Sequence, residues 1–409
     1  MHGRARRSVV PPGTLPAMDE RATGPATSGA EDGASRVSPL ELFFDLVMVF
    51  AITQITGLVG HDHDAHGVLR GVLLFAALWW AWGAYAWLTN TVRVDDMRVR
   101  LVLLGGMAAT LVAALAVPDS FEDDGVAFGL AYLAVMALHL ALFALAATDR
   151  ETSRQAILRL APTNLGAGVL LVIGGALHGG GQEALWALAV VVIFVGPYVT
   201  GVGGFSIHPG HFAERHGLIV IVALGESVIA IGAGGEVSVD GTLAATALAA
   251  IALVIGLWWA YFDHDAEQNE AALTAATGPE RAALARDTYS YLHVPLVLGI
   301  VLAAVGLHDA LAHPDEHLDP LIGGLLAAGV AMYFLGLVAM RARCSSAPGP
   351  WYPAAVAASA AVGLAAQHVP AAASLVVLAA VALGAATADG LRRPASGTDA
   401  RSEAAAGPA

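Results

Sequence analysis

Residues 213–233 read AERHGLIVIVALGESVIAIGA, and this stretch decides the fold class. After the charged start at Glu214 and Arg215 the run is almost entirely apolar, and one acid, Glu226, interrupts it. About 20 apolar residues in a helix cross the hydrocarbon core of a bilayer, at about 1.5 Å of rise per residue. The stretch therefore predicts a transmembrane helix with a carboxyl group inside it.

The same pattern recurs along the whole chain. Hydrophobic residues make up 57% of the 409 residues and charged residues only 13%, where a soluble domain carries about 25% charged residues. We expect an all-α, polytopic transmembrane bundle of about twelve spans. The last two are alanine-rich and only moderately hydrophobic, and without them ten spans would remain. The predicted spans are residues 39–59, 68–89, 100–118, 125–147, 156–177, 183–204, 213–233, 242–262, 290–307, 320–340, 353–367 and 370–389.

The arginines give this predicted bundle an orientation. All 20 cationic residues are arginine, and cytoplasmic loops of membrane proteins are rich in such residues. With a cytoplasmic N-terminus, only Arg70 falls on the outer side, where the loops instead carry acids such as Glu122, Glu236 and Asp240. We therefore predict a multi-pass protein with both termini in the cytoplasm, and disordered cytoplasmic tails at residues 1–37 and 392–409.

Composition and missing motifs exclude several classes. A net charge of −14 argues against nucleic acid as a partner, and a single cysteine, Cys344, forms no disulfide within the chain. No ATP-binding P-loop and no zinc-protease or serine-hydrolase motif occurs. The sequence therefore leaves open whether the protein is an enzyme and favours a protein without enzymatic activity. The loop from His61 to His66 has metal-binding residue types but no fixed metal-site spacing, and we predict no metal and no cofactor.

A short internal repeat suggests two related halves. Leu78-Trp79-Trp80-Ala81 in the second predicted span recurs as Leu257-Trp258-Trp259-Ala260 in the eighth. Six spans is an even number, so halves at residues 38–210 and 211–391 would share one orientation, as parallel repeats do. The alternative is two tryptophan pairs placed independently near a membrane interface.

The first predicted span carries two acids near its start. Ser38, Pro39 and Glu41 form a capping-box pattern, which gives Glu41 a structural role at a helix N-terminus. Asp45 lies one turn deeper, beyond the cap. Because acids are expensive inside a membrane, Asp45 is a candidate functional residue; the alternative is a buried hydrogen bond or salt bridge to an arginine on the inner side.

Glu226 is the most informative residue of the sequence, because it lies close to the middle of its span. A stripe of small residues that includes Ala223 and Ser227 borders it, and such stripes allow helices to pack closely. We therefore expect Glu226 to point into the bundle and to bind and release a proton or ion. The alternative is a protonated structural hydrogen-bond donor.

Two histidines lie within other spans. His139 is near the middle of the fourth and His293 is early in the ninth. Either could partner a carboxyl group in a proton relay, although a lone histidine on an apolar face is more often a satisfied core residue.

Two long motifs resemble a known family. The run from Ser38 to Val47 with Phe50-Ala51-Ile52-Thr53-Gln54, and the segment from His211 to Ala230, are similar to the two signatures of bacterial low-temperature-requirement A proteins. The resemblance covers about residues 38–390, with Met48 a small departure. It implies a multispan protein of the bacterial inner membrane and marks six signature positions without defining their roles: Glu41, Asp45, Glu214, Arg215, His216 and Glu226.

These observations lead to a first functional hypothesis. We expect a secondary transporter or permease, with proton coupling as one form of it, in which Asp45 and Glu226 together carry a proton or small solute. The partners are then the lipid bilayer and that solute, and the sequence leaves the oligomeric state open. A membrane-embedded enzyme or cofactor-binding protein and a non-catalytic membrane sensor or scaffold are the alternatives.

Overall fold

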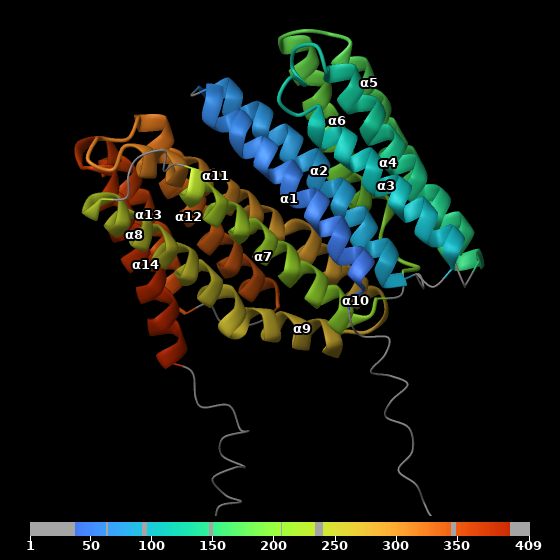
Figure 1. Cartoon of the computed structure of the whole chain (residues 1–409). Helices are drawn as coiled ribbons and strands as arrows, with labels where there is room; N and C mark the ends of the chain where they lie inside the picture. The colour runs from blue at the N-terminus through green and yellow to red at the C-terminus, as the bar shows by residue number, and fades with distance from the viewer. Residues whose placement is uncertain are drawn as a thin grey trace, which may run out of the picture. The chain divides into compact units, whose positions relative to one another are not determined.

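The computed structural model describes residues 37–62, 64–91, 96–146, 150–205, 207–233, 240–344 and 349–392 (Figure 1). Helices account for every regular element of these residues, since the β-structure among them is one isolated bridge. The helices are α1 (Pro39–Asp62), α2 (Ala65–Thr91), α3 (Met97–Leu115), α4 (Gly125–Ala146), α5 (Arg150–Gly175), α6 (Gly180–Thr200), α7 (Pro209–Ala233), α8 (Gly241–Ala260), η2 (Tyr261–Asp265), α9 (Ala266–Ala275), α10 (Gly278–Leu284), η3 (Ala285–Tyr291), α11 (His293–Ala312), α12 (Pro320–Arg343), α13 (Trp351–Ala365), η4 (Ala366–His368) and α14 (Ala371–Leu391).

The all-α membrane bundle is confirmed, and one of its predicted spans is short. Within the described residues, 11 helical segments are long and apolar enough to cross a membrane. The exception is α13, the eleventh predicted span, which has 15 residues. At about 1.5 Å per residue it is about 22 Å long, short of the roughly 30 Å hydrocarbon core.

Although α13 is short, it runs between the same two ends of the helix bundle as its neighbours α12 and α14. At its start, a Cβ on Gly349 would lie 2.9 Å from Asp389 Oδ1 near the end of α14. At its far end, the backbone N–H of Ala371 donates to the carbonyl of Glu316 in the α11–α12 loop, at 2.8 Å. The chain therefore traverses the bundle at α13, and η4 completes the passage.

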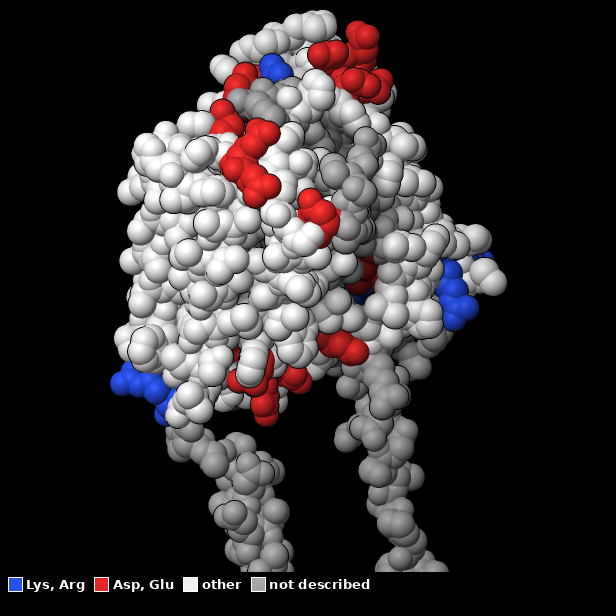
Figure 2. Space-filling view, turned by 60° about the vertical axis from the view of Figure 1, so that its left-hand side comes forward, with Lys and Arg blue, Asp and Glu red and all other residues white. Residues whose placement is uncertain are grey.

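Large apolar side chains cover the outside of the described bundle. Leu101, Leu115, Leu145 and Val199 are each more than half exposed, and many other leucines and valines are partly exposed. Figure 2 shows a face that is mostly free of charged side chains across its middle, with most of the charged ones toward the two ends. Such an apolar girdle is stable in contact with lipid chains rather than with water, so the structure implies a bilayer environment.

Helix α11 lies at the centre of the packing, in contact with α1, α7, α12 and α14. It approaches α12 most closely where two glycines face each other. A Cβ on Gly299 would lie 2.6 Å from Gly329 O, and a Cβ on Gly329 would meet Gly299 O at a closer distance still. Small residues permit this approach, as they do in other membrane helix pairs.

This contact gives the first prediction. Gly329→Ala should destabilise the protein by about 1–3 kcal/mol, because the added methyl group forces α11 and α12 apart. Gly324→Ala on the same helix is the matched control, since a Cβ there meets nothing within 4 Å. Thermal unfolding of both variants in detergent measures the difference; equal melting temperatures would show that the contact is not tight.

Two short π-helices interrupt the second part of the chain. Helix α8 continues through η2 into α9, and η3 joins α10 to α11. π-Helical turns are rare and occur often at functional sites, because they re-aim side chains along a helix. Here they place Tyr261 and Tyr289 beside His293, with ring centroids 5.7 and 5.2 Å away.

A buried ion cluster fixes α12 against η2 and α14. Arg341 Nε donates to Asp265 Oδ1 at 2.7 Å, and Arg341 Nη2 donates to Asp389 Oδ2 at 2.8 Å. The guanidinium also lies 4.0 Å above the ring of Tyr352. This arginine therefore has a packing role that its position just after the predicted span at residues 320–340 did not indicate.

Several predictions remain untested by the fold. Residues 1–36 and 393–409, which make up most of the two predicted tails, lie outside the described residues, as do His63 and Glu236. The described residues from 37 to 392 belong to one compact unit. The two halves at 38–210 and 211–391 therefore remain a prediction, and their tryptophan pairs differ in environment: Trp79 is buried, whereas Trp258 is exposed.

Candidate functional site

The two signature segments lie against each other, because α1 packs on α7. At the start of α1 the predicted capping box forms. The backbone N–H and the hydroxyl of Ser38 donate to Glu41 Oε2 at 2.8 and 2.9 Å, and the N–H of Glu41 points back at Ser38 Oγ at 3.4 Å. Glu41 has a second role, because His211 Nε2 of α7 lies 3.2 Å from its Oε1.

Asp45 is held by two donors from two other helices. Arg215 Nη1 of α7 donates to Asp45 Oδ2 at 3.1 Å, and Trp82 Nε1 of α2 donates to Asp45 Oδ1 at 2.8 Å. All three residues are at most 1% exposed. Asp45 thus takes the alternative that the sequence left open, a buried salt bridge, although its partner lies on α7.

Arg215 joins both acids of α1 in one charged cluster. Its Nε lies 3.9 Å from Glu41 Oε1, and its guanidinium carbon lies 5.6 Å from the centre of the Trp82 ring. We call Glu41, Asp45, His211 and Arg215 the ion-paired cluster. Because the two acids and the arginine are nearly fully buried, the cluster fixes the register of α1 against α7.

His216 is the next residue after Arg215, and aromatic rings surround it. Its Nδ1 donates to Phe212 O at 2.8 Å, a contact that requires the proton on Nδ1. Its ring centroid lies 5.0 Å from both Trp82 and Tyr289 and 5.3 Å from His293. His216 Nε2 and the Tyr289 hydroxyl are buried and lack a hydrogen-bond partner among the described residues.

Glu226 also lies between α1 and α7, but further along these helices than the ion-paired cluster. Thr53 Oγ1 of α1 donates to Glu226 Oε2 at 2.6 Å and lies 3.1 Å from Val49 O. The carboxyl group lines a cavity of about 370 Å³ enclosed by α1, α7, α11 and α12. We call this the Glu226 cavity. Its lining is Thr53, Thr56, Gly57, Gly60, His61, Glu226, Ile229, Ala230, Val305, His308, Asp309 and Ile322.

The structure does not bring Asp45 and Glu226 together. Asp45 contacts Arg215 and Trp82, whereas Glu226 contacts Thr53, which is eight positions further along α1, or about 12 Å. Asp45 is also absent from the lining of the Glu226 cavity. Ser227 is buried next to Glu226 and does not line the cavity either.

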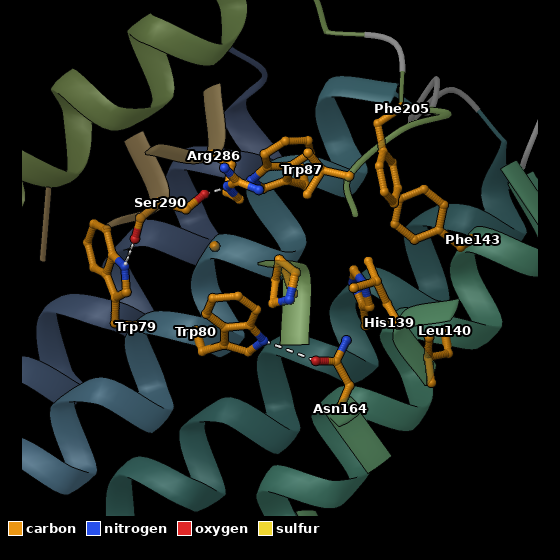
Figure 3. A pocket seen from close by; sticks show the side chains of 15 residues that line it. Trp79, Trp80, Trp87, His139, Leu140, Phe143, Asn164, Phe205, Arg286 and Ser290 are labelled. Carbon is orange, nitrogen blue, oxygen red and sulfur yellow. Dashed lines mark hydrogen bonds between the residues drawn. The ribbon is translucent and has the colours of Figure 1, made fainter. Parts of the chain in front are cut away.

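Glu214 and His139 lie apart from both of these places. Glu214 Oε2 accepts the backbone N–H of Val37 at 3.2 Å, and the side chain lines a groove between α7 and α9 with Glu267 and Glu270. His139 of α4 is buried between Tyr85 and Phe143, with centroid distances of 5.4 and 5.2 Å. It lines a separate aromatic pocket that α2, α4, α5, α6 and η3 enclose (Figure 3).

Sequence reasoning missed several residues that complete these places. Trp82 directly follows the repeated Leu78–Ala81 motif and His211 begins the second signature segment, but neither pattern indicates a contact with an acid of the first span. Thr53 belongs to the signature of the first span, yet a threonine in an apolar run gives no signal of a carboxyl partner on another helix. Tyr289 could not be found, because no local pattern predicts a π-helix.

Comparison with known proteins assigns the family. The family model described as bacterial low temperature requirement A protein matches residues 36–387, which include every residue of the ion-paired cluster and of the Glu226 cavity. An uncharacterised protein of Rhizobium meliloti (strain 1021) is 32% identical over 324 residues, covering 76% of this chain and 78% of its own length. The chain therefore belongs to the bacterial low temperature requirement A protein family.

Proposed function

We propose that the protein is a secondary transporter or permease of the bacterial cytoplasmic membrane, in which Glu226 binds and releases a proton or a small cation. The observation that carries this proposal is the position of one carboxyl group in a cavity inside the bundle. Glu226 faces that cavity with a neutral hydroxyl, Thr53, as its partner rather than a cation. Acids at membrane depth that face a cavity are typical of ion and proton pathways.

The cavity leads from Glu226 toward one end of the helix bundle. Its lining runs along α1 from Thr53 to His61 near the helix end, and along α11 from Val305 to Asp309. His61, His308 and Asp309 add polar groups at that end, where a proton or cation would enter. In the orientation that the arginines indicate, this is the outer face.

Toward the other end, the ion-paired cluster and the aromatic rings around His216 close the space between α1, α2 and α7. The large side chains there are buried, Trp82, Arg215 and Phe212 among them. In this proposal the structure is an outward-open state, and the ion-paired cluster is the closed inner gate. Alternating access would require the contacts between α1 and α7 at this gate to loosen.

Accessibility from one face tests this arrangement. We expect Gly57→Cys, in a background with Cys344→Ala, to react with a membrane-impermeant thiol reagent added to the outside of intact cells. A side chain at Gly57 meets nothing within 4 Å and projects into the Glu226 cavity. The wild-type protein is the control for the opposite face, because its Cys344 lies at the other end of the bundle, at the end of α12. Labelling of Gly57→Cys only after the cells are opened would reverse the orientation.

Transport itself is tested with purified protein in liposomes that contain a pH-sensitive dye. An imposed pH gradient, or a gradient of a monovalent cation, should collapse faster than in empty liposomes. Equal rates for protein-containing and empty liposomes under every gradient would reject the proposal.

A further inference from the structure

The aromatic pocket is a second cavity that the proposed transport does not use. It shares no lining residue with the Glu226 cavity. Its volume is about 70 Å³, where one water molecule needs about 10–15 Å³ by a comparable measure. The pocket therefore has room for a small ring-sized molecule rather than for a single water.

Its walls are flat aromatic rings from three parts of the chain. Trp79, Trp80 and Trp87 come from α2, Phe143 from α4, and Phe205 from the segment after α6 (Figure 3). Trp87 and Phe143 meet the Phe205 ring edge-on, with centroids 5.5 and 5.7 Å away. Walls of this kind pack well against the faces and edges of a planar guest.

The deep end of the pocket offers hydrogen-bonding groups. Trp80 Nε1 donates to Asn164 Oδ1 at 3.0 Å, which fixes the amide and leaves its Nδ2 as a donor. Close by in Figure 3 lies His139, whose buried Nδ1 has no hydrogen-bond partner among the described residues. An apolar pocket with a few such groups is the usual form of a small-molecule site.

The other end of the pocket is positively charged. Arg286 lines it and shares the carboxylate of Asp287 with Arg343: Arg286 Nη2 lies 2.7 Å from Oδ1, and Arg343 Nε lies 2.9 Å from Oδ2. Arg159, next to the lining residue Leu160, donates to Gly203 O at 2.6 Å. Arg286 and Arg343 share the single carboxylate of Asp287, so these three groups carry an excess of positive charge, which attracts an anion.

We propose that this pocket binds a single-ring aromatic carboxylate. The ring lies between Trp80, Trp87 and Phe205. The carboxylate accepts a hydrogen bond from an N–H group of Arg286 other than those on Nε and Nη2, which contact Asp287. The site is independent of the Glu226 cavity, so it stands or falls separately from the proposed transport.

Two probes of the same shape test the proposal, benzoate and its neutral isostere benzamide. Purified full-length protein in lipid nanodiscs should bind radiolabelled benzoate saturably, with one site per chain. Arg286→Gln should weaken benzoate binding at least tenfold, since the carboxylate loses a charge-assisted hydrogen bond, and should leave benzamide binding unchanged. Unchanged benzamide binding also shows that the variant is folded.

Two further variants locate the site. Asn164→Leu and Trp80→Phe should weaken both probes, whereas Trp258→Phe, at an exposed tryptophan on α8, should weaken neither. Non-saturable uptake of both probes would mean partition into lipid and would overturn the proposal. Equal loss of benzoate and benzamide in Arg286→Gln would reject the carboxylate contact, and unchanged binding in Asn164→Leu and Trp80→Phe would reject the pocket.

Discussion

Arg215→Met should unfold the protein at a markedly lower temperature than the wild type. The substitution leaves the carboxylates of Asp45 and Glu41 buried without their cation, and removing one partner of a buried ion pair costs about 3–5 kcal/mol. Thermal unfolding of the purified protein in detergent measures the effect.

A second variant separates charge from packing. Combining Arg215→Met with Asp45→Asn removes one of the uncompensated charges, and we expect part of the lost stability to return. Arg159→Met is the control, because that arginine is exposed and makes one hydrogen bond to a carbonyl. If Arg215→Met and Arg159→Met had the same melting temperature, the ion-paired cluster would not stabilise the contact between α1 and α7.

Glu226→Gln should abolish proton or cation flux in liposomes while the protein stays folded. Glutamine keeps the size of the side chain and still accepts the hydrogen bond from Thr53, but it neither ionises nor exchanges a proton. We expect flux to fall at least tenfold, to the level of empty liposomes. The melting temperature should change little, because no cation pairs with Glu226 in the described residues.

Glu214→Gln is the matched control for this result. Glu214 is also on α7, but it faces a groove beside α9 rather than the Glu226 cavity. Its replacement should leave flux at the wild-type rate. Full flux through Glu226→Gln, or equal loss in both variants, would remove Glu226 from the transport step.

The span pattern could be predicted from the sequence because hydropathy acts locally. Each apolar run of about 20 residues forms its own helix, since the bilayer leaves no other partner for its backbone groups. α13 lies at the predicted eleventh span, residues 353–367, although it is short for a membrane helix. Its 15 residues are apolar enough, but a shorter helix is tolerated because α12 and α14 pack on both sides.

The site was less predictable, because it depends on pairing between distant segments. In the sequence, Asp45 and Glu226 are both acids within predicted membrane spans, and this similarity led to the hypothesis that they form one site. Which of them is neutralised depends on the rotation of α7 against α1, and this rotation brings Arg215 to Asp45 and Thr53 to Glu226. The two acids have different partners, so the structure does not support the hypothesis that they form one joint site.

Chemical labelling of carboxyl groups tests the central claim most directly. A hydrophobic carbodiimide forms a stable adduct with a protonated carboxyl group, and a carboxyl group that exchanges protons with the cavity is protonated for part of the time. Treated protein in liposomes, digested and mapped by mass spectrometry, should carry the adduct on Glu226 and none on Glu41 or Asp45, which are buried beside Arg215 and form ion pairs with it. An adduct on Asp45 with Glu226 unmodified, or no adduct on any of the three, would contradict the account.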